Sequence, residues 1–217
     1  MEEAFLFIDT ENIRFYREDF YWIFRARIQH LSHVYVYLNC AKRTIHHKFY
    51  DEMSDQFPMT IRNLATTPRK KNGLDIHMTM DIMDFVHSRS LSSDIRTTIY
   101  IASNDSDFAV VCQRLASPPH LLFGRIFHND EIASSNVSLH IHLSELTVDD
   151  RIIARCFFHW KTGVLTMNRL KKTIRGMKRR LSFPLDNLTD YLNRSYFDVT
   201  HRENTTIITT TIFSIPE

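Results

Sequence analysis

The chain has 217 residues and a net charge of +2, with 43% hydrophobic residues, four glycines and six prolines. This composition supports one sizeable core, or one α/β domain with a small companion, and it excludes a low-complexity or linker-rich chain. The three cysteines are odd in number and lack CxxC spacing, which excludes a disulfide framework or a zinc finger and indicates a reducing, intracellular compartment, either cytoplasmic or nuclear.

Residues 1–146 alternate between short apolar runs and stretches with helical spacing. The first run, "AFLFI", is only five residues long and follows no basic leader, so it predicts a strand rather than a signal peptide or a membrane span. Further strands are predicted at 34–38, 97–102, 120–127 and 138–143, and helices at 17–31, 44–57, 76–88 and 106–116. This alternation predicts βαβ crossovers, and therefore an α/β domain with a central parallel sheet and helices on both faces.

Residues 147–217 have a different sequence pattern from residues 1–146, and this pattern predicts a second, small α+β domain. Three helical stretches are followed by a β-hairpin whose turn is the polar "HRENT", which is the element order of a winged helix. The second of these helices is predicted over 169–180. Residues 1–150 carry 15 Lys/Arg against 20 Asp/Glu, whereas residues 151–217 carry 12 against 5. This asymmetry suggests that the C-terminal part holds a partner's phosphates.

Acidic residues gather where predicted strands end. Asp9 closes the first strand, and Asp105 and Asp107 follow the strand at 97–102. Asp75 begins a predicted helix, and Asp81 follows one and a half turns later. Ligands of open parallel sheets bind at the carboxyl ends of the strands, and acids that converge there repel one another unless a cation lies between them. Mg²⁺ or Mn²⁺ fits such a site, because hard cations prefer carboxylate oxygens. Taken singly, Asp9 and Asp107 could instead cap the helices that follow them.

Three stretches carry a resemblance to a known family. The segments "FIDTEN" (7–12), "KKNGLDIHMTMDIMDFV" (70–86) and "IASNDSDF" (101–108) look like the three signature blocks of the NYN domain, a branch of the PIN-like metal-dependent ribonucleases, in order and spacing. The resemblance implies a three-layer α/β/α fold with a divalent metal, Mg²⁺ or Mn²⁺. It also implies hydrolysis of RNA to products with a 5′-phosphate and a 3′-hydroxyl. The catalytic residues that it implies are Asp9, Asn12, Asp75, Asp105 and Asp107, and the metal ligands are Asp9, Asp75, Asp81, Asp105 and Asp107.

The chain departs from the family pattern at two positions. Thr10 and Asn104 stand where the family usually has glycine. Asparagine tolerates a positive φ better than most residues, so Asn104 is expected to preserve the turn. Thr10 is β-branched and stiffens a position where the backbone could need to approach a phosphate. Every acid is present, which favours an active enzyme.

Basic residues near these blocks and in the C-terminal part are predicted to contact the nucleic-acid backbone. The predicted contacts are Arg14, Arg17, Arg69, Lys70, Lys71, Lys171, Lys172, Arg175, Lys178 and Arg179. Solvated basic surface is the alternative for each of them. The C-terminal module is similar in outline to LOTUS domains, which accompany NYN domains in some proteins, and it could instead bind a protein or a second copy of the chain.

The sequence therefore predicts a metal-dependent endoribonuclease domain at 1–146 and a basic winged-helix-like domain at 147–217. Its expected substrate is single-stranded RNA, although no residue can be assigned to the 2′-hydroxyl and DNA stays an alternative. No membrane partner is expected. The alternative function is an inactive adaptor of the same fold that binds RNA or protein through the C-terminal module. Loss of cleavage in Asp105→Asn would separate the two functions.

Overall fold

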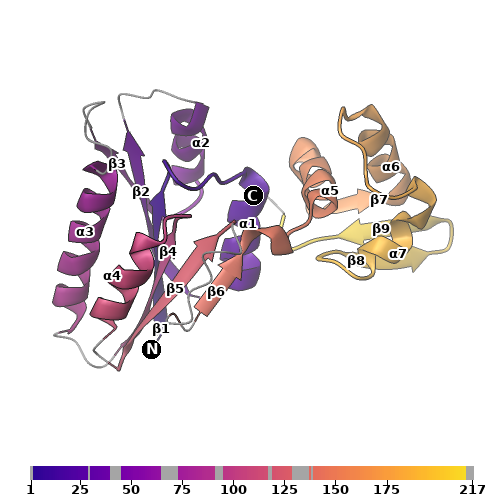
Figure 1. Cartoon of the computed structure of the whole chain (residues 1–217). Helices are drawn as coiled ribbons and strands as arrows, with labels where there is room; N and C mark the ends of the chain where they lie inside the picture. The colour runs from indigo at the N-terminus through magenta and orange to yellow at the C-terminus, as the bar shows by residue number, and fades with distance from the viewer. Residues whose placement is uncertain are drawn as a thin grey trace. The chain divides into compact units, whose positions relative to one another are not determined.

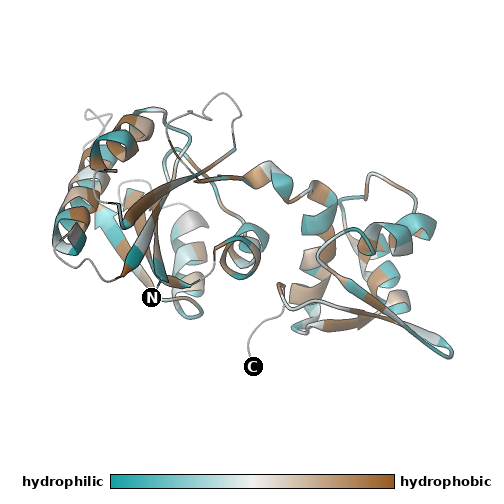
Figure 2. Ribbon diagram, turned by 90° about the horizontal axis from the view of Figure 1, so that it is seen from below, coloured by the Kyte–Doolittle hydropathy of each residue, from teal (hydrophilic) through white to brown (hydrophobic). Residues whose placement is uncertain are grey.

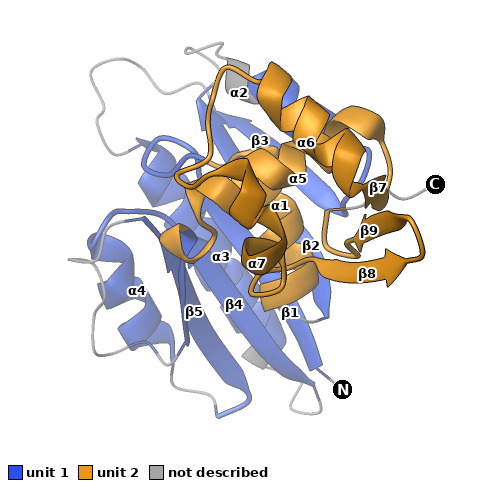
Figure 3. Cartoon of the chain, turned by 90° about the vertical axis from the view of Figure 1, so that its right-hand side faces the viewer, with its two compact units in different colours: residues 1–14, 28–143 blue, residues 15–27, 144–217 orange. Residues whose placement is uncertain are grey.

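A computed structural model gives the fold of residues 2–28, 30–39, 45–64, 73–90, 95–116, 119–128, 137 and 139–213. The chain forms two compact units, residues 1–14 with 28–143 and residues 15–27 with 144–217, coloured blue and orange in Figure 3. This division differs from the predicted boundary between residues 146 and 147: the second unit begins at residue 144 and also includes residues 15–27. Each unit is described by itself.

The first unit is built on a six-stranded sheet in the order β3-β2-β1-β4-β5-β6, with every neighbouring pair parallel. The strands are β1 (Glu2–Asp9), β2 (Leu31–Asn39), β3 (Met59–Leu64), β4 (Arg96–Ala102), β5 (Leu121–Phe127) and β6 (Leu139–His142). The predicted parallel sheet is confirmed. Strand β3 was not predicted, because it lies at the sheet edge and its half-buried or exposed residues form no continuous apolar run.

Helices cover both faces of this sheet (Figure 1). Helices α3 (Gly73–Ser90) and α4 (Asp107–Leu115) lie on one face, and α2 (Ile45–Ser54) lies on the other. The core between the sheet and α3 and α4 includes Phe7, Ile101, Met78, Ile82 and Phe108. In Figure 2 the central strands are largely brown, whereas the helices alternate between brown and teal, as expected for strands covered on both faces and helices covered on one.

The second unit is a small α+β fold with a three-stranded antiparallel sheet in the order β7-β9-β8. Its elements are α1 (Arg17–Trp22), the π-helical turn η1 (Ile23–Arg27), α5 (Val148–Trp160), β7 (Val164–Thr166), α6 (Met167–Gly176), the 3₁₀ turn η4 (Leu185–Asn187), α7 (Leu188–Leu192), β8 (Asp198–Arg202) and β9 (Thr205–Thr209). A further 3₁₀ turn, η3 (Leu143–Glu145), precedes α5. The three predicted C-terminal helices and the terminal hairpin are confirmed.

Helix α1 joins the second unit through buried ion pairs and aromatic contacts. The buried carboxylate of Asp19 accepts hydrogen bonds from Arg151 on α5, and Glu18 pairs with Arg155 one turn further along α5. The ring of Tyr21 packs against Phe158, with 4.8 Å between ring centroids. The predicted helix at 17–31 is therefore shorter, since η1 ends it at residue 27.

Helix α6 is also shorter than the predicted helix at 169–180. It ends at Gly176, the poorest helix former in this stretch, and Met177 has an extended backbone. Lys178 and Arg179 consequently lie beyond the helix rather than on it. Among the helices of the described residues, none is both long and apolar enough to cross a membrane.

Candidate active site

The ends of two central strands bring the first and third acidic blocks together. Strand β1 pairs in parallel with β4, and Ile8 lies opposite Ala102, so the next residues, Asp9 and Ser103, emerge at the same edge of the sheet. The Ser103 hydroxyl donates a hydrogen bond of 2.8 Å to the Asp9 carboxylate. Both residues are fully buried. The structure thus places Asp9 on the same rim as the turn that carries Asp105 and Asp107.

Three donors hold Asp9 in one orientation. Besides Ser103, the Asn12 side-chain amide donates at 2.7 Å and the Glu11 backbone N–H at 3.1 Å. Burial raises the pKa of Asp9, and the hydrogen bonds from Ser103, Asn12 and Glu11 oppose that rise. Asn12 therefore helps to orient the Asp9 carboxylate, which is held in one position in the site.

The turn after β4 presents Asp105 and Asp107. The backbone N–H of Asp105 donates to the Ser103 hydroxyl at 3.0 Å, and the N–H of Asp107 donates to the Asp105 carboxylate at 2.9 Å. Ser106 occupies the N-cap position of α4, so Asp107 is the first helical residue and its carboxylate is exposed. The capping alternative for Asp107 does not apply to this geometry.

A buried cation supports this turn from below. Arg125 on β5 is fully buried, and one guanidinium nitrogen donates to the carbonyl of Ser103 at 2.9 Å and to that of Asp105 at 2.6 Å. Burial lowers the pKa of Arg125, while the nearby Cys112 and Asp105 oppose this change. Arg125 thereby fixes the backbone on both sides of Asn104 and places positive charge beneath the acids.

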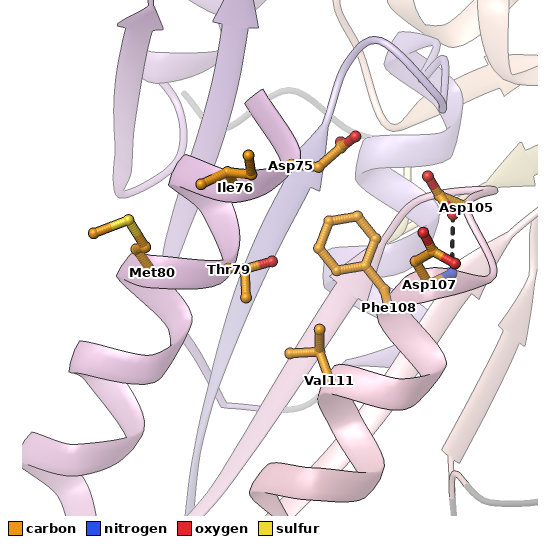
Figure 4. Close-up of a pocket in the computed structure, with 8 residues that line it drawn as sticks. All are labelled: Asp75, Ile76, Thr79, Met80, Asp105, Asp107, Phe108 and Val111. Atoms are coloured by element: carbon orange, nitrogen blue, oxygen red, sulfur yellow. Dashed lines mark hydrogen bonds between the residues drawn. The ribbon is translucent and has the colours of Figure 1, made fainter. Parts of the chain in front are cut away.

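Asp75 lies in the first turn of α3, at the edge of a cavity of about 260 Å³. Its carboxylate points toward Asp105 and Asp107 in Figure 4. Burial, followed by the charges of Asp9, Asp105, Glu11 and Asp107, raises the pKa of Asp75 to about 6. Its buried Oδ1 accepts no hydrogen bond from the described residues. The five acids are therefore electrostatically linked through Asp75, whose pKa the other four raise.

Opposite the acids, the same cavity has an apolar wall. Helix α3 contributes Ile76, Thr79 and Met80, and α4 contributes Phe108 and Val111, as Figure 4 shows. Ile76 and Met80 are 58% and 57% exposed, which is unusual for large apolar residues beside carboxylates. The cavity therefore combines carboxylates with exposed apolar side chains.

The donors of this site fit a hard divalent cation in chemistry. They are all carboxylate oxygens, and one buried oxygen of Asp75 has no hydrogen-bond donor. Among the described residues, no three His, Cys, Asp or Glu side chains lie close enough to hold one ion directly. Mg²⁺ commonly binds through one or two carboxylates and keeps several waters, so these acids suit such an ion without three direct protein ligands.

Asp81, which was predicted as a further metal ligand, lies away from this cavity. Six residues advance an α-helix by about 600°, so Asp81 faces a direction about 240° from Asp75. Its carboxylate accepts a hydrogen bond of 2.8 Å from the Tyr37 hydroxyl and pairs with Arg62. It lines a different hollow, together with Arg62 and Asp84. The structure does not bring Asp81 to the other acids.

The two positions where glycine was expected have structural partners of their own. The Thr10 hydroxyl donates to the carbonyl of Tyr37 at 2.7 Å. The Asn104 side chain donates to the carbonyl of Asn12 and accepts from the N–H of His128, each at 2.8 Å. Asn104 is not among the described residues with a positive φ. Its side chain ties the first and third blocks together, which is a different role from relief of a strained turn.

The predicted basic contacts fall in different places. Arg14 is exposed in the first unit, and its carbonyl accepts from His128. Arg17 belongs to the second unit, with its guanidinium 5.9 Å from the centroid of the Phe158 ring. Arg69, Lys70 and Lys71 lie outside the described residues. Of the C-terminal five, Lys171, Lys172 and Arg175 are on α6, and Lys178 and Arg179 follow it.

Sequence analysis missed three residues of the site. Ser103 and Glu11 stand inside the quoted blocks, where the acids drew attention instead. Arg125 gave one usable signal, a lone cation in the apolar strand "HLLFGRIF", because a charge in a strand buried on both faces needs a partner.

Ser103 provides a direct test of the site's geometry. Replacing Ser103 by alanine removes one donor from Asp9 and the acceptor for the Asp105 N–H, so both acids lose orientation. We expect Mn²⁺ affinity, measured by isothermal titration calorimetry, to fall about 10- to 100-fold, as for other groups that orient metal ligands. Ser103→Thr, which keeps the hydroxyl, should retain most of the affinity. Equal affinities of wild type and Ser103→Ala would remove Ser103 from the site.

Comparison with protein families identifies the chain. The NYN domain model matches residues 3–131, which include all five acids of the site. The chain belongs to the NYN domain family. This is a family of PIN-like ribonucleases, typically metal-dependent and generally acting on RNA.

Solved structures agree with the fold of this NYN domain. A crystal structure of a protein of unknown function from Vibrio parahaemolyticus is similar, with a TM-score of 0.50 and 11% sequence identity, over 65% of this chain and 92% of that one. At this identity the likeness shows the fold alone. No curated protein matches the chain. No comparison identifies the C-terminal part.

Proposed function

We propose that this NYN domain protein is a divalent-metal-dependent endoribonuclease that hydrolyses single-stranded RNA. The observation that carries the proposal is the convergence of Asp75, Asp105 and Asp107 on one cavity, where burial and the charges of four nearby acids raise the pKa of Asp75. Strongly perturbed carboxylates that converge in a cleft are typical of catalytic sites. The cavity's apolar wall suits an unpaired base beside the scissile phosphate.

The chain's own residues have distinct roles in this proposal. The ion, Mg²⁺ or Mn²⁺, would be held directly or through waters by Asp75, Asp105 and Asp107. Asp9 would add negative charge to the site from its fixed, buried position. When bound, the ion would lower the pKa of a water and offset the charge that develops on the phosphate. Asn12, Ser103 and Arg125 keep the acids in place, so that little reorganisation is needed during the reaction. The expected products carry a 5′-phosphate and a 3′-hydroxyl.

The second candidate function is an RNA-binding or protein-binding adaptor without catalysis. The absence of three directly ligating side chains among the described residues favours it. An adaptor would need the acids only for solubility, and substitution of one of them would change nothing. The three donors to the fully buried Asp9, from Glu11, Asn12 and Ser103, are not explained by that function.

Cleavage of a labelled single-stranded RNA separates the two functions. The wild-type chain should cut it with Mn²⁺ or Mg²⁺ and not with EDTA, and Asp105→Asn should cut about 100-fold more slowly while binding the RNA equally well. A 3′-hydroxyl on the upstream product, detected by polymerase extension, identifies the chemistry. An adaptor would bind the RNA and leave it intact in every buffer, and that result would overturn the nuclease proposal.

A further inference from the structure

The second unit has a hollow that the proposed nuclease chemistry does not use. It has a volume of about 440 Å³ and lies where the end of α5 meets α6. Trp160, Arg169, Lys172, Thr173, Gly176 and Met177 line it. The size falls within the range of small-ligand sites, and none of its aromatic or glycine residues was among the predicted contacts.

Trp160 is held in one orientation at this hollow. Its side chain is 39% exposed, although it is one of the largest apolar groups of the chain. The indole N–H donates to the Thr173 hydroxyl at 3.0 Å, and that hydroxyl donates to the carbonyl of Arg169 at 2.8 Å. The Arg169 guanidinium lies over the indole, with its central carbon 3.7 Å from the ring centroid. The pair forms a flat, cationic surface that is ordered before any ligand arrives.

Positive charge surrounds this surface without acidic neighbours in sequence. Between Arg151 and Leu185 the chain has ten Lys/Arg and no Asp/Glu. Lys172 and Arg175 are exposed on α6, and neither forms an ion pair with a described residue. A second hollow of about 520 Å³, further along the chain, is lined by Arg175, Lys178 and Arg180. Successive phosphates of one strand could therefore pass from Lys172 to Arg180.

Gly176 keeps the hollow open. A Cβ atom at this position would meet no atom within 4 Å, so the glycine is not required by packing. Alanine and leucine are both better helix formers than glycine, by up to about 1 kcal/mol. A larger side chain at residue 176 is therefore expected to fill the hollow without destabilising the fold, which separates a binding role from a structural one.

We propose that this hollow binds one unpaired nucleotide of single-stranded RNA, with the base stacked on the Trp160–Arg169 pair and its flanking phosphates on Lys172 and Arg175. Bases of single-stranded RNA are free to stack on aromatic rings and guanidinium planes, whereas bases inside a duplex are not. The choice of RNA rests on the proposed function of the first unit. The site lies within the second unit alone, so it does not depend on how the two units are arranged.

The test uses the full chain with Asp105→Asn, in EDTA, so that no RNA is cut during the measurement. The probe is a labelled, unstructured RNA of about 12 nucleotides, long enough for more than one phosphate contact. Fluorescence anisotropy gives the Kd, and tryptophan fluorescence reports on the stack. The chain has two tryptophans and Trp22 is fully buried, so quenching by RNA is expected from Trp160.

Four variants distinguish stacking from charge and from misfolding. Trp160→Ala and Gly176→Leu should each raise the Kd about 10- to 100-fold, the loss expected for one stacked base, and should leave the salt dependence unchanged. Trp160→Phe should recover part of the affinity because it retains a ring. Lys172→Ala should instead lower the slope of log affinity against log salt by about 0.7. Gly176→Leu should melt no lower than the parent chain.

Several results would overturn the site. Wild-type affinity in Gly176→Leu, or equal affinity for duplex and single-stranded RNA, contradicts a base in this hollow. Unquenched tryptophan fluorescence in the RNA complex does the same. RNA cleavage by the wild-type chain in Mn²⁺ is measured separately. If the wild-type chain cleaves RNA but these variants bind it normally, the nucleotide site is wrong and the nuclease proposal stands. If RNA binds through this hollow but the wild-type chain never cleaves it, the nuclease proposal is wrong and the nucleotide site stands.

Discussion

Asp75→Asn is expected to abolish most RNA cleavage and, at the same time, to stabilise the metal-free protein at neutral pH. Asp75 lies under the combined charge of Asp9, Asp105, Glu11 and Asp107, so a cation in the cavity would relieve repulsion on its carboxylate. Replacing it by a neutral amide should slow cleavage about 1000-fold, which corresponds to about 4 kcal/mol of transition-state stabilisation. Single-turnover cleavage in Mn²⁺ measures this effect.

The gain in stability follows from the direction of the pKa shift. Folding raises the pKa of Asp75 from about 3.9 in an unfolded chain to about 6, so the folded state binds the proton more tightly. The free energy of unfolding therefore falls as the pH rises from about 4 to about 6, and the loss persists above that range. Asparagine does not titrate and avoids this loss, which is on the order of 1 kcal/mol after allowance for solvent screening.

Thermal melts with and without metal show both effects in one experiment. In EDTA at pH 7.5 (about 1.5 units above the raised pKa), Asp75→Asn should melt above wild type, and the difference should disappear toward about pH 4. Saturating Mn²⁺ should reverse the order, because it stabilises only the chain that binds it. If the variant instead melts below wild type in EDTA at pH 7.5, Asp75 is not under the repulsion that the site requires.

Asp81→Asn is the matched control for this prediction. Asp81 is an acid of the same helix, six residues further on, but its carboxylate pairs with Tyr37 and Arg62 outside the cavity. We expect its cleavage rate to stay within about threefold of wild type and Mn²⁺ to raise its melting temperature by as much as it raises that of wild type. A large loss of cleavage in Asp81→Asn would return this residue to the metal site.

Most of the first unit could be predicted because its strands are buried on both faces. Continuous apolar runs such as "AFLFI" and "TTIYIA" predict such strands. The rule that ligands bind at the carboxyl ends of parallel strands then places Asp9 and Asp105 at one edge of the sheet. The edge strand β3 was not predicted because its residues are half-buried or exposed and form no continuous apolar run. Asp81 was predicted to lie with the other acids because it follows Asp75 closely on the same helix. The rotation of the helix between the two residues turns the Asp81 side chain away from the cavity.

The packing of α1 in the second unit could not be predicted from the local sequence pattern. Residues 17–27 have the spacing of an amphipathic helix, which predicts burial but not the partner that buries it. The partner is set by charge and shape over a distance of more than a hundred residues, through Asp19 with Arg151 and Glu18 with Arg155. The same limit applies to Trp160, whose contact with Arg169 arises only when α5 and α6 pack.

Arg125→Met is expected to lower cleavage about 100-fold and the free energy of unfolding by about 2 kcal/mol. Methionine has a similar length and packs well, but it leaves the carbonyls of Ser103 and Asp105 without their buried donor, at a cost of about 1 to 3 kcal/mol each. Removal of a buried charge with unpaired nitrogens offsets part of this cost. Chemical denaturation with urea gives the net stability, and Mn²⁺-dependent cleavage gives the activity.

Arg125→Lys separates the charge from the geometry of the guanidinium. Lysine retains the positive charge beneath the acids, but its ammonium sits on a flexible stem and lacks the rigid guanidinium plane that directs one nitrogen toward both carbonyls. We therefore expect an intermediate loss of cleavage, about 10-fold. Arg62→Met removes an exposed cation that pairs with Asp81 and should change neither property. If Arg125→Met and Arg125→Lys lose activity equally, neither the charge nor a flexible donor is sufficient at this position, and the fixed placement of the guanidinium nitrogen toward the two carbonyls is what matters.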